Sequence, residues 1–170
     1  MTGKIIRAVA GFYFVYCYED SIEYKCRARG LFRRDKFKPL VGDDCTFSLT
    51  QTEEVEGCVS EISKRRNFLI RPPVANVDQA LVVFALADPD PNLSLLDRFL
   101  IRMQRSSVPT VICFNKTDLV CGEQTEELAR IYEACGSRIL TASILNEEGL
   151  GEIRSVMKGK TTVLAGPSGV

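Results

Sequence analysis

Residues 109–119 read Pro-Thr-Val-Ile-Cys-Phe-Asn-Lys-Thr-Asp-Leu, an apolar run that passes directly into a polar loop. The run is short and rich in β-branched residues, as is typical of a strand buried on both faces. A second such run, residues 80–86, ends at the breaker sequence Asp-Pro-Asp-Pro-Asn over residues 88–92. Two doubly buried strands predict a parallel sheet with helices on its faces.

Apolar residues at helical spacing follow each of these strands. Ser94 and Asp97 resemble a capping box before a stripe of Leu96, Phe99, Leu100 and Met103. A second stripe ends at Gly136 and consists of Leu128, Ile131, Tyr132 and Cys135. We also expect a strand over 138–141, a helix over 150–157 and a strand over 161–165. The alternation predicts an α/β domain with a parallel sheet over residues 71–170.

The N-terminal segment has strand periodicity instead. From Ile22 to Arg29 polar and apolar residues alternate strictly, which predicts a half-buried strand with a basic outer face. Residues 12–18 are expected to pair with it as a hairpin, and a fourth strand is expected over 55–62. The third strand should turn Cys45, Phe47 and Leu49 inward. Short strands at this spacing predict a small β-barrel of the oligonucleotide-binding type over residues 1–70.

Charge is distributed unevenly along the chain. The chain has 22 basic and 22 acidic residues, yet only Asp35 opposes the seven basic residues Lys25, Arg27, Arg29, Arg33, Arg34, Lys36 and Lys38. Such a stretch suits a polyanion, and these residues are candidates for RNA binding. A merely solvated strand face is the alternative. Aromatic side chains nearby could stack bases, but we expect most of them to fill the core.

Composition excludes several classes of site. The 170 residues include no histidine, so imidazole catalysis and a Cys/His zinc site are excluded, and no metal site is expected in this chain. The cysteines contain no C-x-x-C pair and are expected to be reduced core residues. The longest apolar run has eight residues, too short to span a bilayer. We see no secretory signal and expect a cytoplasmic protein.

The polar loop after Phe114 is an N-K-x-D motif, Asn115-Lys116-Thr117-Asp118. The Asp118 carboxylate can accept hydrogen bonds from the ring N–H and the amino group of guanine, a donor pair that adenine lacks. The stem of Lys116 can cover the base, and Asn115 can tie neighbouring loops together. A loop that only caps a helix is the alternative interpretation.

A glycine turn follows the last expected strand. Gly166-Pro167-Ser168-Gly169-Val170 matches the first five positions of the phosphate loop G-x-x-x-x-G-K-[ST], although a flexible tail would have similar composition. In ordinary GTPases the phosphate loop precedes N-K-x-D, whereas here it follows. This order predicts a circularly permuted GTPase.

With these motifs in place, the sequence resembles the RsgA family, also called YjeQ or YloQ, of circularly permuted GTPases that depend on the small ribosomal subunit. The resemblance covers nearly the whole chain. It depends on residues 26–30 (CRARG), 38–43 (KPLVGD), 71–79 (RPPVANVDQ), 96–100 (LDRFL), 115–118 (NKTD) and 166–170 (GPSGV).

The resemblance implies a barrel that contacts 16S rRNA of the 30S subunit and a GTPase domain that uses GTP/GDP with Mg²⁺ during late subunit maturation. It also implies a C-terminal zinc domain, which this chain does not contain, and a monomer. The catalytic group is unknown and expected beyond Val170, so the 170-residue polypeptide is expected not to hydrolyse GTP.

The second base-binding loop aligns with residues 141–144, where Ala142 or Ser143 would give its amide to the guanine oxygen. A non-catalytic RNA-binding module with an α/β scaffold is the alternative function. A small-molecule α/β enzyme is a third possibility, but no motif in the sequence supports it.

Overall fold

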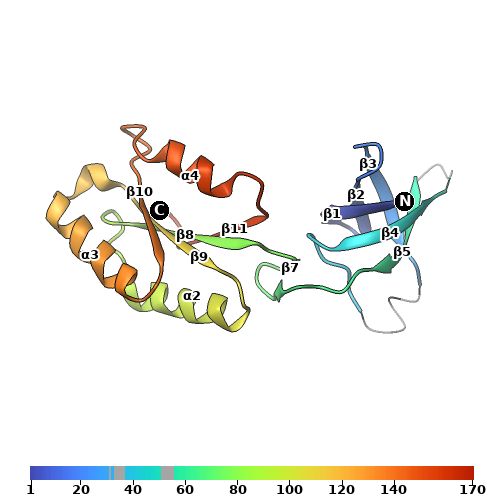
Figure 1. Cartoon of the computed structure of the whole chain (residues 1–170), viewed down its shortest axis with the longest axis horizontal. Helices are drawn as coiled ribbons and strands as arrows, with labels where there is room; N and C mark the ends of the chain where they lie inside the picture. The colour runs from blue at the N-terminus through green and yellow to red at the C-terminus, as the bar shows by residue number, and fades with distance from the viewer. Residues whose placement is uncertain (31, 33–36, 51–55) are drawn as a thin grey trace. The chain divides into compact units, whose positions relative to one another are not determined.

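The computed structural model describes residues 1–30, 32, 37–50 and 56–170 of the chain. Contacts between residues divide it into two compact units, Met1–Asn76 and Val77–Val170 (Figure 1). The domain boundary after residue 70 stays a prediction.

The first unit is a closed five-stranded barrel in the order β1-β2-β3-β5-β4. Its strands are β1 (Thr2–Val9), β2 (Phe12–Cys17), β3 (Glu23–Ala28), β4 (Asp44–Leu49) and β5 (Gly57–Ile62). The pair β3–β5 is parallel and the other pairs are antiparallel. The predicted barrel is confirmed. Strand β1 was not predicted, because a register shift between Ile5 and Arg7 interrupts its alternation and its second half is exposed.

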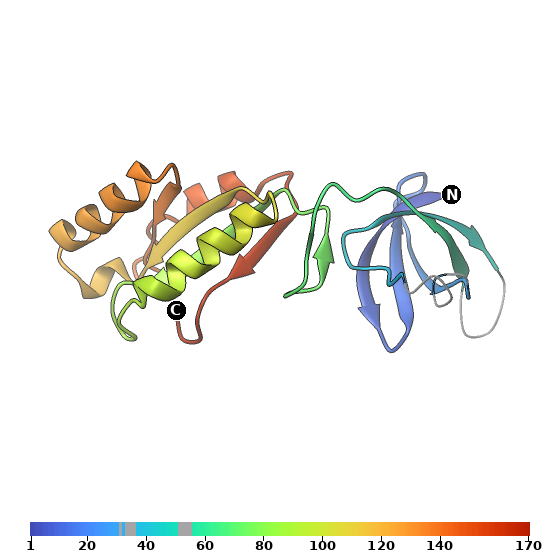
Figure 2. The same cartoon turned by 90° about the horizontal axis from the view of Figure 1, so that it is seen from below.

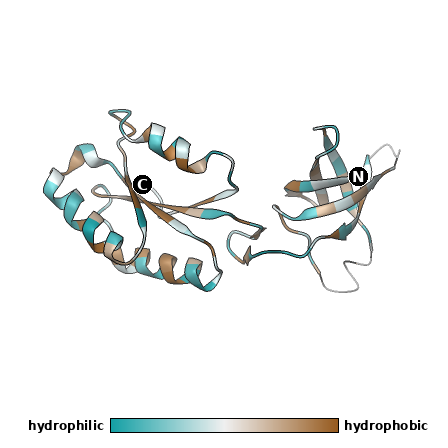
Figure 3. Cartoon of the chain, in the orientation of Figure 1, coloured by the Kyte–Doolittle hydropathy of each residue, from teal (hydrophilic) through white to brown (hydrophobic). Residues whose placement is uncertain are grey.

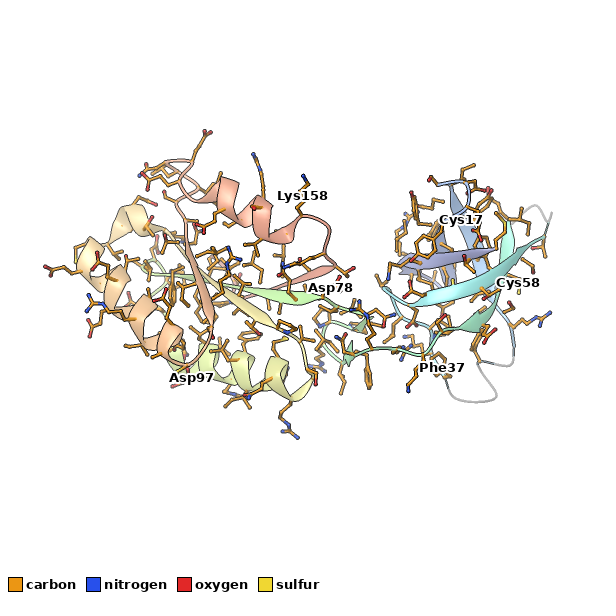
Figure 4. The ribbon with its side chains drawn as sticks, viewed as in Figure 1. Cys17, Phe37, Cys58, Asp78, Asp97 and Lys158 are labelled. Carbon is orange, nitrogen blue, oxygen red and sulfur yellow. The ribbon has the colours of Figure 1, made fainter. Side chains whose placement is uncertain are left out.

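Apolar and sulfur-containing side chains fill the barrel. Its buried cluster consists of Ile5, Val15, Cys17, Cys26, Cys45, Phe47 and Val59. Cys17 is labelled in Figure 4. The prediction that Leu49 points into the barrel is wrong. Leu49 is 50% exposed, because it occupies the last position of β4, where the barrel ends. The same prediction is also wrong for Ile22, which precedes β3 and is exposed.

A buried ion pair fixes the connection that leaves the barrel. Asp43 is fully buried, and its two carboxylate oxygens accept hydrogen bonds from the Arg65 guanidinium at 2.7 and 2.8 Å. The Leu40 amide donates to the same carboxylate at 2.7 Å. Beyond Arg65, β6 (Phe68–Leu69) and β7 (Val74–Ala75) form a small hairpin. The pair therefore ties the segment after β5 to the residue that precedes β4.

The second unit is a four-stranded parallel sheet in the order β10-β9-β8-β11. Its strands are β8 (Gln79–Ala85), β9 (Thr110–Asn115), β10 (Arg138–Thr141) and β11 (Thr162–Ala165). Helices α2 (Leu93–Arg105) and α3 (Gly122–Ala134) lie on one face, and α4 (Leu150–Met157) lies on the other (Figures 1 and 2). The predicted parallel α/β sheet is confirmed.

The helices bury narrow stripes against this sheet. Helix α3 is largely hydrophilic (Figure 3), and Tyr132 is its buried residue. On the other face, Val156 of α4 packs in a cluster with Leu81 and Leu140. Figure 4 labels Asp78 just before β8 and Lys158 just after α4. No helix among the described residues is long and apolar enough to cross a membrane.

Two expectations about helix ends and cysteines are corrected. The capping box at Ser94 and Asp97 is wrong, because Asn92 caps α2 by accepting a hydrogen bond from the Leu95 amide at 3.0 Å. Asp97 instead accepts a hydrogen bond from the Tyr132 hydroxyl at 3.1 Å. Two of the cysteines, Cys121 and Cys135, are exposed rather than core residues, because they flank α3 at its two ends.

Candidate nucleotide site

The sheet topology brings the two sequence motifs to one edge. Strands β9 and β11 both pair with β8 in parallel, so the loops that follow them leave from the same end of the sheet. Asn115 is the last residue of β9, and Gly166 follows β11 directly. The reversed order of the motifs along the chain therefore does not separate them in space.

The Lys116 side chain connects three loops at this edge. Its ammonium donates a hydrogen bond to the Gly169 carbonyl at 2.7 Å and another to the Asp88 carbonyl. Asp88 lies in the loop after β8, so one cation joins the loops that follow β8, β9 and β11. The backbone of Lys116 is left-handed, with φ 61°, which turns the chain sharply at the end of β9.

The two glycines of the 166–170 turn are required by geometry. A Cβ at Gly166 would lie 2.4 Å from the Val83 carbonyl oxygen, so a side chain there would clash with β8. Gly169 has a φ of +84°, a conformation that L residues rarely adopt. Pro167 and Ser168 lie between them, and Val170 follows. The turn therefore packs tightly against β8 at Gly166 and changes direction at Gly169 in a conformation that glycine favours.

The Asp118 carboxylate is exposed and held by one buried partner. The Ser143 hydroxyl donates a hydrogen bond to Asp118 Oδ1 at 2.5 Å, and Ser143 itself is fully buried. The same hydroxyl oxygen accepts a hydrogen bond from the Asn146 amide at 3.1 Å. Asp118 Oδ2 has no hydrogen-bond partner within the described part of the chain. The carboxylate is thus oriented while one oxygen stays available.

The loop after β10 offers a different backbone amide from the two that the sequence predicted, those of Ala142 and Ser143. The Ala142 amide donates to the Phe114 carbonyl at 2.9 Å, and the Ser143 amide donates to the Glu148 carbonyl at 3.2 Å. Both amide hydrogens are therefore occupied. The next amide, that of Ile144, meets no acceptor among the residues described, and Ile144 is 67% exposed. Sequence reasoning missed Ile144, although the serine before it, able to bond a carboxylate, was a usable signal.

Two further residues of the N-K-x-D motif, Thr117 and Asn115, belong to the site. The Thr117 amide and hydroxyl both donate to the Ala142 carbonyl at 3.2 Å, which joins the loops after β9 and β10. Asn115 is 5% exposed, and its side-chain oxygen is buried with no partner among the described residues. A buried amide left unpaired costs about 1–3 kcal/mol. The motif therefore leaves one buried acceptor at the end of β9 without a donor from the residues that the structure describes.

The barrel carries part of the predicted basic stretch. Lys25 and Arg27 lie on β3, and Arg29 and Lys38 lie in the segments beyond it. Arg33, Arg34 and Lys36 lie outside the described residues. Arg27, Arg29 and Lys38 line a hollow of about 530 Å³ together with the aromatic residues Tyr13, Phe32 and Phe37. Figure 4 labels Phe37. A hollow of this size and charge suits an anionic group with an aromatic part.

Comparisons with known proteins agree on one family. A model described as "RsgA GTPase" matches residues 62–170, and one described as "RsgA N-terminal domain" matches residues 2–59. Two curated relatives bear the name small ribosomal subunit biogenesis GTPase RsgA. The one from Agathobacter rectalis is 49% identical and covers 100% of this chain and 59% of its own length. The one from Alkaliphilus metalliredigens is 46% identical and covers 99% and 57%.

Solved structures show the same relationship. The circularly permuted GTPase YloQ is 38% identical with a TM-score of 0.82, and YjeQ from Thermotoga maritima is 28% identical with a TM-score of 0.86. Each alignment covers 99% of this chain and 60% of the other chain. The chain thus spans less than two thirds of the length of the proteins it matches.

Proposed function

Since the chain belongs to the RsgA GTPase family, we propose that it binds guanine nucleotide at the edge of its parallel sheet and serves a GTPase of small ribosomal subunit biogenesis. In the whole protein this activity is the hydrolysis of GTP to GDP. The names of the curated relatives support this function. We further propose that it acts as a monomer in the cytoplasm, on the 30S particle and its 16S rRNA.

Guanine recognition is assigned to Asp118. One carboxylate oxygen is held by Ser143, and the carboxylate accepts hydrogen bonds from the ring N–H and the 2-amino group of guanine. Adenine offers no such donor pair, so its binding would leave the carboxylate unpaired. The exposed amide of Ile144, rather than that of Ala142 or Ser143, donates to the guanine oxygen. The stem of Lys116 covers the base.

The nucleotide phosphates are assigned to the turn of residues 166–170. The single observation that carries the proposal is the hydrogen bond of 2.7 Å from Lys116 Nζ to the Gly169 carbonyl, which joins the base-reading loop to this turn. Mg²⁺, when bound with GTP, neutralises phosphate charge. Among the described residues no three metal-binding side chains come together, so we assign no metal ligand.

The substitution Asp118→Asn tests guanine recognition. An asparagine keeps an acceptor for the ring N–H but presents an amino group, which fits the 2-oxygen of xanthine better than the 2-amino group of guanine. We expect GDP to perturb the backbone NMR signals of residues 116–118 and 144 in the wild-type chain. In the variant we expect xanthosine diphosphate to replace GDP as the preferred ligand.

Glu148→Gln is the control, because this exposed side chain makes no hydrogen bond or ion pair with the described residues, and only the Glu148 backbone bonds Ser143. It should leave the preference for GDP unchanged. If the Asp118 variant keeps the wild-type preference, Asp118 does not read the base, and the α/β unit is better described as a scaffold.

An RNA-binding module without nucleotide chemistry is the second candidate. It is favoured by the hollow lined by Arg27, Arg29 and Lys38. We assign these cations and Lys25 to the phosphates of rRNA under either function. Binding to 30S particles should then weaken steeply as salt rises, because phosphate contacts release counterions. Salt-independent binding would contradict this assignment.

A further inference from the structure

The outer surface of β2 carries aromatic side chains at every second position. Phe12, Phe14 and Tyr16 alternate with Val15 and Cys17, which are fully buried in the barrel. Phe12 and Phe14 are partly exposed, and Tyr16 is 38% exposed. Strand geometry therefore turns the three rings to the outside. The expectation that aromatic residues mainly fill the core is wrong for these three.

Cations from the two neighbouring strands lie over these rings. On β1, Arg7 pairs with Phe14, and its Cζ lies 3.6 Å from the centre of that ring. On β3, Arg27 pairs with Phe12 and Lys25 pairs with Phe14. Arg27 Cζ and Lys25 Nζ lie 4.9 and 4.4 Å from the centre of the Phe12 ring. Rings and cations thus interleave across β1, β2 and β3.

Among the described residues, the three cations Arg7, Lys25 and Arg27 lie beside two carboxylates, those of Glu23 and Glu56. Glu23 on β3 forms an ion pair of 3.0 Å with Arg7, and both side chains are largely exposed. Glu56 accepts a hydrogen bond of 2.8 Å from the Lys25 amide. The Lys25 ammonium itself contacts the Phe12 ring and no carboxylate among the described residues. The surface therefore combines flat apolar rings with cations suited to phosphate.

We propose that this aromatic face, defined as Phe12, Phe14 and Tyr16 with Arg7, Lys25 and Arg27, binds unpaired RNA by stacking its bases. The inference rests on the proposed RNA-binding function and adds the class of RNA. Bases stack on aromatic rings and on guanidinium planes, while cations contact the phosphates. A duplex keeps its bases stacked on one another, so it cannot offer them to the rings. Single-stranded segments therefore bind this face.

The test uses the full chain and a short fluorescein-labelled oligoribonucleotide without self-complementarity, measured by anisotropy at several salt concentrations. Phe12→Leu and Phe14→Leu keep apolar volume but remove the ring. Each should weaken binding by roughly 5- to 150-fold, the range for loss of one base stack, without changing the salt slope. Phe14→Tyr keeps a ring and should bind as the wild type does. Lys25→Gln should lower the slope by about 0.7 for one lost phosphate contact.

Phe68→Leu is the matched control, because Phe68 is a surface phenylalanine, 53% accessible and so more exposed than Phe12 and Phe14, on β6 rather than on the aromatic face. Thermal melts identify any variant that fails to fold, and Phe14→Tyr keeps the proposal testable in that case. Wild-type affinity in both leucine variants together with weakened binding in Lys25→Gln would overturn stacking but leave the proposed RNA contact intact. Wild-type binding in all variants would overturn both. Equal loss of duplex RNA binding in the leucine variants would overturn the preference for unpaired RNA.

Discussion

Replacing the buried Asp43 with alanine should strongly lower the free energy of unfolding of the barrel. Asp43 is 0% exposed at its side chain and Arg65 only 17%, so Asp43→Ala leaves a guanidinium in a mostly buried place without its partner. Breaking such a pair costs about 3–5 kcal/mol. A unit of residues 1–76 is expected to be stable by about 4–11 kcal/mol. The loss is therefore about a quarter or more of the total.

Tyrosine fluorescence during urea unfolding measures this effect in the right part of the chain. The chain has five tyrosines and no tryptophan, and only Tyr132 lies outside the first unit. With an m-value of about 1.5 kcal/mol/M, a loss of 3–5 kcal/mol lowers the midpoint by about 2–3 M. Far-ultraviolet circular dichroism then follows the helices, which belong mainly to the second unit.

Two comparisons make this prediction refutable. Glu61→Ala removes an exposed carboxylate from β5 and should change the free energy of unfolding by less than about 0.5 kcal/mol. The double variant Asp43→Ala with Arg65→Met should lose less stability than the sum of the two single variants, since each single variant leaves one unpaired charge and the double variant leaves none. If Asp43→Ala behaves like Glu61→Ala, or if the losses simply add, the buried pair does not stabilise the barrel as argued.

Three further changes have defined outcomes. Gly149→Ala should destabilise the second unit by at least about 1 kcal/mol, because φ at this position is +74° and the new Cβ would lie 2.0 Å from the Thr141 carbonyl oxygen. Thermal melts measure this loss, and an unchanged melting temperature would contradict it. Ser143→Ala removes the hydrogen bond of 2.5 Å to Asp118 and should weaken GDP binding roughly 10-fold. Titration calorimetry measures this affinity, and an affinity equal to that of the wild type would mean that the Ser143 hydroxyl does not orient the carboxylate. Burial raises the pKa of the Cys45 thiol from 9.0 to about 12, so its contribution to stability is present below pH 9 and is lost as pH rises toward 12. The urea midpoint should therefore fall across this window, and less steeply in Cys45→Ala.

Much of the fold follows from local patterns. The apolar runs of β8 and β9 are continuous because both faces of a central parallel strand are covered, and this made the α/β unit predictable. The hairpin β2–β3 followed from an aromatic and β-branched run, a polar break at residues 19–21 and the strict alternation after it. Strand β1 did not, because a bulge interrupts its period and its ladder depends on partners up to 44 residues away, as Thr2 pairs with Thr46.

The details of the site were less predictable for a related reason. A four-residue motif indicates the residue types that guanine needs, but not which amide is left without an acceptor. Ala142 and Ser143 lose their amides to Phe114 and Glu148, and these bonds depend on the register of β10 beside β9 and on the closure of the loop that follows. The outward direction of the β2 rings likewise depends on which face the barrel closes around.

By itself the sequence determined the two kinds of periodicity, the chemistry of the N-K-x-D and glycine motifs and their reversed order, all of which are properties of neighbouring residues. Only the tertiary structure decided that Lys116 reaches Gly169, that Ser143 holds Asp118 and that cations from β1 and β3 lie over the rings of β2. These contacts join residues far apart in the chain. Their geometry depends on strand order, register and barrel closure, which arise from the packing of the whole unit.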